Sequence, residues 1–189
     1  MSFVTLPSAA SWRHGGTRTG FEVAFFSHDD RGPRAEGTTT ATEDGKSWVV
    51  DYMIQLDDSW LTRSARIVGR SGGSTIVTVI ETDGRGHWQV DGVAAPHLQG
   101  CLDLDLEASA MTNTFPVHRL RLPANRAVAA PAAYVRAVGL EVGRLEQTYS
   151  QQSEEHYDYT APAFDFACRL VYDQHGLILH YPGIATRIQ

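Results

Sequence analysis

Hydrophobic and polar residues alternate along much of this chain in short segments, which is the pattern of half-buried β-strands. In the first half, the segments rich in β-branched and aromatic residues are 21–26, 47–56, 61–68, 75–81 and 87–90. The dipeptides Asp44-Gly45, Asp83-Gly84 and Asp91-Gly92 lie between such segments. Because glycine accepts the positive φ that tight hairpin turns require, this half predicts an antiparallel meander.

The second half continues in the same way. Its extended segments are 102–106, 117–122, 127–138, 145–149, 156–160, 164–172 and 177–181. In 164–172 the apolar side chains from Phe164 to Tyr172 fall on one face, and Asp165 and Arg169 fall on the other. The best helical candidate, 124–133, is interrupted by Pro131, so at most one or two short helices are expected. We predict an all-β fold with a long antiparallel sheet rolled on itself, because a flat sheet of about a dozen strands would leave long exposed edges.

The segment from Gly100 to Leu120 departs furthest from what packing alone favours. If residues 101–107 are extended, leucines cover one face and three carboxylates crowd the other: Asp103, Asp105 and Glu107. Those carboxylates repel one another and therefore need water, cations or arginines. Three basic residues follow shortly after: His118, Arg119 and Arg121.

Two acids that neighbour each other on this face, Asp103 and Asp105, allow three interpretations. They could form ion pairs with arginines of neighbouring strands, among them Arg63 and Arg119, and so lock the sheet. They could instead hold the polar headgroup of a ligand. Finally, Asp-x-Asp spacing places the two Cα atoms roughly 6.5 to 7 Å apart, which allows the ~5 to 9 Å between carboxyl groups that glycoside hydrolases use.

Other side chains offer weaker candidates. Six aromatic residues could pack in the core or stack on a ligand: Trp60, Trp88, Tyr149, Tyr157, Tyr159 and Tyr181. The eight histidines are scattered without metal-ligand spacing, and His118 beside Arg119 is the most plausible base among them. The glycine-rich run 69–74 precedes a β-branched segment, so it predicts a hairpin turn and not a phosphate-binding loop. We therefore expect no metal and no cofactor.

Length, charge and cysteine content narrow the function classes. The 189 residues suit one domain over 1–189, and 16 basic against 22 acidic residues give a net charge of −6 without any basic run. That charge pattern argues against nucleic acid as a partner. We find no secretion signal and no stretch of 18 apolar residues, so no transmembrane segment is expected. Two isolated cysteines, Cys101 and Cys168, fit a cytoplasmic protein.

The same motifs resemble those of a bacterial family of putative glycolipid-binding proteins. The matching positions are Gly100, Cys101, Asp103, Asp105, Asn113, Thr114, Pro116, Arg119 and Leu120. Further matching motifs lie at 60–63, 86–88, 91–92, 147–149, 173–176, 181–183 and 187, so the resemblance covers nearly the whole chain. It implies a spiral β-roll.

From the residues and the resemblance together we expect non-catalytic binding of a glycolipid or another amphipathic molecule. The expected ligand-binding residues are Trp60, Arg63, Trp88, Asp103, Asp105, Asn113, Arg119, Tyr149 and Tyr157. This hypothesis requires a cavity of ~300 Å³ or more that opens beside Asp103 and Arg119. The first alternative is a hydrolase of glycosides or esters that uses Asp103 and Asp105, with His118 assisting. The second is a structural or protein-interaction module that forms a homodimer through an exposed sheet edge.

Overall fold

Strands dominate the fold, which is taken from a computed structural model describing residues 3–120 and 126–188. The strands before the helix are β1 (Ala9–His14), β2 (Arg18–Asp29), β3 (Gly32–Glu43), β4 (Lys46–Leu56), β5 (Thr62–Ser71), β6 (Ser74–Thr82), β7 (Trp88–Val90), β8 (Val93–Ala94) and β9 (Asp103–Leu106). Those after it are β10 (Val128–Ala129), β11 (Ala132–Val135), β12 (Val142–Leu145), β13 (Thr148–Gln151), β14 (His156–Ala161), β15 (Phe166–Tyr172), β16 (Ile178–Tyr181) and β17 (Ala185–Ile188). The helical elements are α1 (Thr114–Arg119) and the 3₁₀ turns η1 (Pro96–Leu98), η2 (Met111–Asn113) and η3 (Pro162–Phe164).

One antiparallel sheet of 14 strands runs through the molecule in the order β10-β13-β14-β15-β16-β17-β1-β2-β3-β4-β5-β6-β7-β8. Pairing of β17 with β1 joins the two ends of the chain in the middle of this sheet. A second sheet, β12-β11-β9, contains a parallel pair between β9 and β11. The expected all-β architecture with a long antiparallel sheet and a short helix is therefore confirmed.

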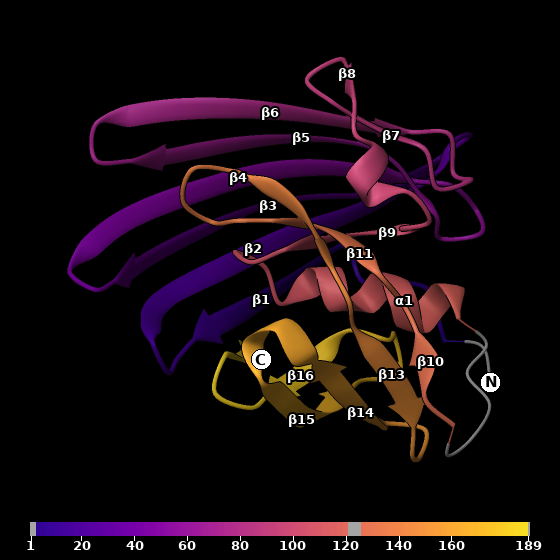
Figure 1. Cartoon of the computed structure of the whole chain (residues 1–189). Helices are drawn as coiled ribbons and strands as arrows, with labels where there is room; N and C mark the ends of the chain where they lie inside the picture. Colours follow the sequence, from indigo (N-terminus) through magenta and orange to yellow (C-terminus); the bar gives the residue numbers. More distant parts are fainter. Residues whose placement is uncertain (1–2, 121–125, 189) are drawn as a thin grey trace.

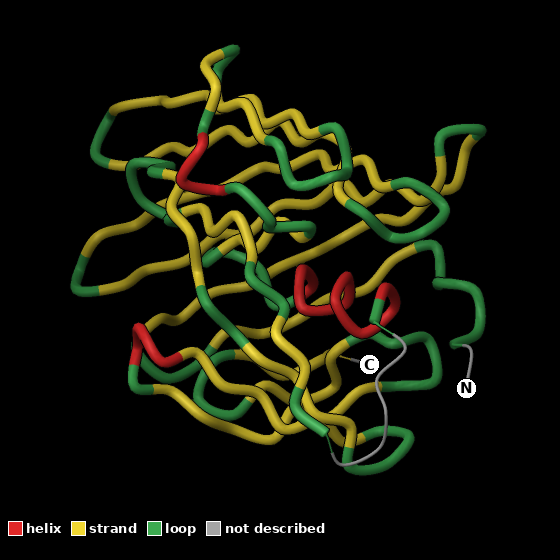
Figure 2. Tube along the Cα trace, turned by 45° about the vertical axis from the view of Figure 1, so that its right-hand side comes forward, coloured by secondary structure: helices red, strands yellow, loops and turns green. Residues whose placement is uncertain are grey.

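The long sheet curls, and the smaller elements lie on its concave side. Figure 1 shows β2 to β6 above α1, β1 level with it and β13 to β16 below it. Figure 2, which is turned by 45°, again shows the central helical segment between the strands above it and those below it. Because β9 and α1 fill this concave side, the acidic strand lies in the interior of the molecule.

Local turn chemistry explains the hairpins. Asp44 and Gly45 both take positive φ (49° and 73°) between β3 and β4. Asp91 and Gly92 do the same between β7 and β8, with φ of 51° and 76°. The 69–74 run forms the predicted hairpin turn, since Ser71 and Ser74 face each other where β5 pairs with β6. Two consecutive turn residues with positive φ match the twist of the flanking strands.

Three sequence-based assignments need correction. Segment 117–122 was predicted as a strand, but residues 114–119 form α1, while 121 and 122 lie outside the described residues. Of the helical candidate 124–133, residues 124 and 125 lie outside the described part, and the remainder contains β10 and the start of β11. The pattern also missed β1, β3 and β17. In β3, small residues and threonines replace the usual alternation of large apolar and polar residues.

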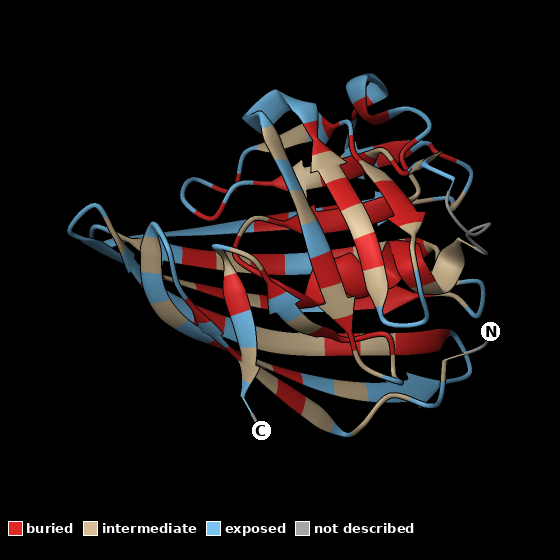
Figure 3. Cartoon of the chain, turned by 90° about the horizontal axis from the view of Figure 1, so that it is seen from below, coloured by how far each residue is buried: buried red, intermediate tan, exposed pale blue. Residues whose placement is uncertain are grey.

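Buried side chains form one hydrophobic cluster between the two faces of the curl. Trp12, Ile54, Leu104, Phe115 and Tyr172 are among its largest members, each with an exposure of 1% or less. Figure 3 shows this buried zone around α1 and the strands that face it, with exposed residues at the hairpin ends. Among the described residues, no helix has the length and apolarity needed to span a bilayer.

Candidate functional site: an aromatic pocket with a buried carboxylate

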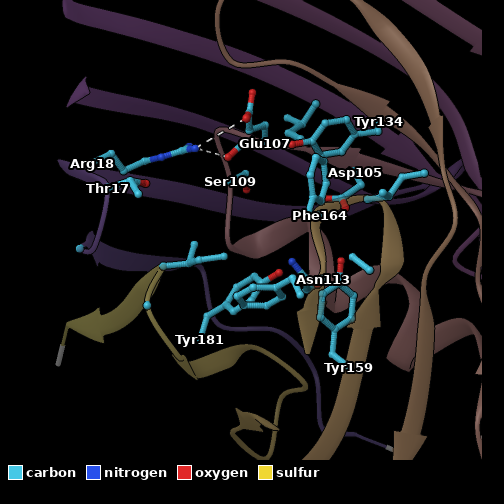
Figure 4. Close-up of a pocket in the computed structure, with 17 residues that line it drawn as sticks. Thr17, Arg18, Asp105, Glu107, Ser109, Asn113, Tyr134, Tyr159, Phe164 and Tyr181 are labelled. Carbon is cyan, nitrogen blue, oxygen red and sulfur yellow. Dashed lines mark hydrogen bonds and ion pairs between the residues drawn. The ribbon is translucent and has the colours of Figure 1, made fainter. Parts of the chain in front are cut away.

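A pocket with a volume of about 190 Å³ opens between the β1–β2 turn, the end of β9, η3 and the β16–β17 turn (Figure 4). Five aromatic rings line it: Tyr134, Tyr159, Phe164, Phe166 and Tyr181. Its polar lining consists of Thr17, Arg18, Asp105, Glu107, Ser109 and Asn113. Residues far apart in the chain meet here because pairing of β17 with β1 brings the two turns together.

The aromatic rings form two groups. Tyr159, Phe166 and Tyr181 have ring centroids 6.0 to 6.2 Å apart, with interplanar angles of 60° to 81°. Tyr134 and Phe164 form the second group, with centroids 5.5 Å apart and an interplanar angle of 53°. Rings inclined in this way line the corners of a cavity instead of stacking against each other. Phe164 is 48% exposed and therefore lies at the rim.

Asp105 contributes a carboxylate to this apolar surrounding. Its side chain belongs to β9, and the residue is only 8% exposed. Thr112 donates a hydrogen bond to Oδ1 over 2.9 Å, and no arginine or lysine among the described residues bonds to this carboxylate. Burial raises the pKa of Asp105 from 3.8 to about 6, and the negative charges of Asp103 and Glu107 add to this rise. The Thr112 hydrogen bond acts in the opposite direction.

Asn113 also lines the pocket, and two tyrosine hydroxyls hold it in place. The hydroxyl of Tyr149 donates to its Oδ1 over 2.7 Å, and the hydroxyl of Tyr172 donates to its backbone carbonyl over 3.1 Å. Because Oδ1 already accepts a hydrogen bond, the amide nitrogen is the group that remains to donate toward a ligand. The polar lining of the pocket thus includes an acceptor, Asp105, and a donor, the Asn113 amide.

Arg18 spans the rim, and two acidic residues compensate its charge. Its Nη1 donates to the carbonyl oxygen of Glu107 over 2.7 Å. Its Nε lies 3.7 Å from a carboxylate oxygen of Glu43, and its Nη2 lies 3.8 Å from one of Glu107. The guanidinium also stands 5.4 Å from the ring centre of Trp48. Arg18 therefore ties the β2–β3 hairpin to the end of β9.

A second buried acid, Glu22, supports the loop that carries Ser109. Its carboxylate accepts hydrogen bonds from the Tyr52 hydroxyl (2.7 Å), from the Ala110 N–H (2.8 Å) and from the Ser109 hydroxyl. His14 Nε2 lies 3.7 Å from the same carboxylate. Glu22 is completely buried, and its hydrogen bonds fix the backbone between β9 and η2. That loop holds the polar side of the pocket in place.

Of the nine residues expected from the sequence to bind a ligand, Asp105 and Asn113 line this pocket. Asp103 is fully buried and paired with Arg119, which donates from Nε and Nη2 over 2.9 and 2.5 Å. Burial raises the pKa of Asp103, and the hydrogen bonds from Arg119 oppose that rise. The expected opening beside Asp103 and Arg119 must therefore be corrected: the pocket opens beside Asp105, and it is smaller than ~300 Å³.

The other expected residues lie in separate places. Trp60 stacks on His118 with ring centres 3.7 Å apart, and Arg63 donates to the carbonyl oxygen of Asp83 over 2.7 Å. Trp88 donates from its indole nitrogen to the carbonyl oxygen of Cys101 over 2.9 Å. The remaining two, Tyr149 and Tyr157, are buried and do not line the pocket.

His118, the expected assistant base, is packed between Trp60 and Phe3. Its Nε2 donates to the carbonyl oxygen of His175 over 2.9 Å. Burial lowers the pKa of His118 to about 4. Within the described residues, no group of three histidine, cysteine or acidic side chains is placed to hold a metal ion.

Sequence reasoning missed several lining residues, among them Arg18, Glu107, Tyr134, Phe164 and Phe166. They come from several parts of the chain, with only Phe164 and Phe166 close together, and the strand patterns that include Glu107, Phe164 and Phe166 do not mark a pocket. Tyr159 and Tyr181 were recognised only as members of a wider aromatic group. Their convergence depends on pairings between strands that are distant in sequence, which no local spacing reveals.

Comparisons with known proteins agree with the architecture. The chain matches the sequence model of the family described as "Putative glycolipid-binding" over residues 9–187. It is also similar to the crystal structure of a DUF1089 family protein from Pseudomonas aeruginosa, with 32% identity and a TM-score of 0.80. That likeness covers 100% of this chain and 97% of the other. No curated protein matches the chain. Since the family match includes β1 to β17 almost completely, this protein is a member of the Putative glycolipid-binding family.

Proposed function

We propose that this protein binds an amphipathic small molecule, in keeping with the glycolipid suggested by its family name, without chemically transforming it. The pocket at Asp105 is the proposed site. Its aromatic walls would contact the apolar part of the ligand, and Asp105 and Asn113 would contact the polar part. Ligand sites of this kind combine mostly apolar walls with a few well-placed polar groups.

One observation carries the proposal: an aromatic cavity contains a carboxylate that is 8% exposed and bonded only to Thr112 among the described residues. A buried charge without a cationic partner is costly to keep, and its pKa rises as a result. A fold that needed only structural support could satisfy the position with an apolar residue. A ligand whose polar group contacts Asp105 would explain why the protein keeps this unfavourable buried carboxylate.

The volume of the pocket limits the size of the ligand portion that can enter. About 190 Å³ lies below the ~300 to 1,000 Å³ typical of sites that enclose a drug-sized molecule. We infer that a compact portion, such as one headgroup with a few methylene groups, occupies the pocket. The remainder would pass the exposed ring of Phe164 at the rim.

Two features favour binding over hydrolysis. A two-carboxylate mechanism needs both acids free to act on the substrate. Asp103 instead gives both of its oxygens to Arg119 and does not line the pocket, and His118 packs beneath Trp60. Asp105 therefore lacks the partner that the hydrolase hypothesis assigned to it.

Binding can be tested with three single-chain amphiphiles below their micellar concentrations: octyl β-glucoside, octyltrimethylammonium and octyl phosphate. We expect saturable binding of at least one of them, followed by NMR, with shift changes at Tyr159, Phe166 and Tyr181. The variant Phe164→Ala should weaken that binding about threefold or more. Phe25→Ala is the matched control, since Phe25 is also an exposed phenylalanine (59%) but lies on β2 away from the pocket lining. Absence of saturable binding of all three amphiphiles would refute the proposed function.

A further inference from the structure

The pocket has the components of a cation site. Tyr159, Phe166 and Tyr181 stand at steep angles to each other, and Tyr134 and Phe164 add a second pair of rings. Aromatic rings carry negative charge density on their faces, so several inclined rings around one small space attract a cation. Figure 4 shows Asp105 between the Tyr134–Phe164 pair and the rings of Tyr159 and Tyr181. Aromatic walls and a carboxylate thus converge on the same volume.

Charge in and around the pocket is negative on balance. The charged lining residues are Asp105, Glu107 and Arg18. Arg18 is engaged by Glu107 and Glu43 at the rim, so its charge is compensated before a ligand arrives. Asp105 has no such partner among the described residues, and the nearby carboxylates of Asp103 and Glu107 increase the negative potential around it. The unbalanced charge of the pocket is therefore that of Asp105.

We propose that the pocket recognises an organic cation, a quaternary ammonium or a protonated amine, as the polar end of the amphipathic ligand. This inference rests on the proposed function and specifies its headgroup. A cation placed among the rings would neutralise Asp105 at short range, and the burial of this carboxylate (8% exposed) would strengthen the interaction. An anionic headgroup would instead meet the uncompensated carboxylate of Asp105, while Arg18, the cation of the lining, is already paired with Glu107 and Glu43. A neutral sugar would leave the charge of Asp105 unpaired.

Choline and its neutral isostere 3,3-dimethylbutan-1-ol separate charge recognition from shape, because a carbon atom replaces the nitrogen. We expect choline to bind at least tenfold more tightly than the isostere, as measured by NMR titration at constant ionic strength. Glucosamine and glucose form a second matched pair, and a preference for glucosamine would identify an amino sugar as the source of the cation. Equal affinities within both pairs would overturn the proposal.

Two variants identify the recognising groups. Asp105→Asn keeps the shape of the side chain and should reduce choline affinity about tenfold or more, and Asp158→Asn, on the exposed Asp158–Arg169 pair, should not. Phe164→Leu keeps an apolar side chain but removes the ring, so it should reduce choline affinity about two- to thirtyfold and leave the isostere unaffected. Phe164 lies at the rim, so this variant should fold normally. Choline binding that survives both Asp105→Asn and Phe164→Leu would contradict the proposal.

Failure of this inference can be distinguished from failure of the proposed function. If octyl β-glucoside or octyl phosphate binds in the pocket as tightly as octyltrimethylammonium, the cation inference is wrong and amphiphile binding stands. If none of the three binds, both are wrong. Binding of octyltrimethylammonium with at least tenfold preference supports both.

Discussion

Replacement of Asp105 by asparagine should stabilise the protein at neutral pH while it weakens ligand binding. Asparagine has nearly the same shape and retains an oxygen that can accept the hydrogen bond from Thr112. It removes a charge that is 8% exposed and that interacts unfavourably with the carboxylates of Asp103 and Glu107. Stability and binding should therefore change in opposite directions, as is common at functional sites.

The size of the stabilisation follows from the raised pKa of Asp105. The pKa is 3.8 for an ordinary aspartate and about 6 in the folded protein. At about 1.4 kcal/mol for each tenfold change in proton affinity, ionisation of Asp105 costs the folded state about 3 kcal/mol. Because the folded pKa lies above the unfolded one, this cost is absent below pH 3.8, grows as the pH rises and is complete above pH 6.

Urea unfolding of the wild type and Asp105→Asn at several pH values between 4 and 7.5 tests this reasoning. The free energy of unfolding of the variant should exceed that of the wild type by about 3 kcal/mol at pH 7.5, and the difference should shrink toward zero at pH 4. Asp158→Asn is the control, because the exposed Asp158–Arg169 pair should contribute less than about 1 kcal/mol. A difference that does not depend on pH, or a variant less stable than the wild type at pH 7.5, would refute the argument.

Three further predictions concern the buried ion pair, the β1–β2 turn and the pH dependence of binding. Arg119→Ala should lower the free energy of unfolding by about 3 to 5 kcal/mol in urea titrations, because it leaves the buried charge of Asp103 without a partner. Gly16→Ala should destabilise more than Gly45→Ala in thermal unfolding: both glycines have similar positive φ (75° and 73°), but only a Cβ at Gly16 would overlap the carbonyl of the opposite turn. Choline binding should weaken as the pH falls through about 6, because Asp105 becomes neutral while the ammonium keeps its charge.

Each of these has a result that would contradict it. A loss of less than 1 kcal/mol in Arg119→Ala would mean that Asp103 reaches water or another partner. Equal destabilisation by the two glycine variants would show that positive φ alone sets the cost at Gly16. Choline affinity that stays constant from pH 5 to 7.5 would show that Asp105 does not face the cation.

Strand positions with clear alternation could be predicted from the sequence, but weakly patterned strands could not. β2, β4, β5 and β6 alternate clearly, and β5 and β6 end in Gly-containing turns, so local preference and tertiary structure agree. β3 lacks large apolar residues because it faces close neighbours: a Cβ at Gly37 would overlap the ring of Tyr52. Only the packing partner on β4 explains that composition.

Helix α1 is a short element whose sequence does not favour a helix. Its six residues include Pro116 and β-branched Thr114 and Val117, and no helical stripe of hydrophobic residues can develop over such a length. Burial of Phe115 and Val117, together with the hydrogen bond from Tyr172 to the carbonyl of Asn113, stabilises the helix. Tertiary contacts therefore override local preference here.

The candidate site, too, could be predicted from the sequence only in part. The sequence alone determined that Asp103 and Asp105 share one face of a strand in an all-β protein, because side-chain direction in a strand is a local property with a period of two. Only the tertiary structure decided that Arg119 from α1 neutralises Asp103, while Asp105 opens into a pocket whose aromatic rings come from β11, β14, η3, β15 and β16. Burial and partner choice depend on long-range pairing, and two residues with the same local pattern can therefore have opposite electrostatic surroundings.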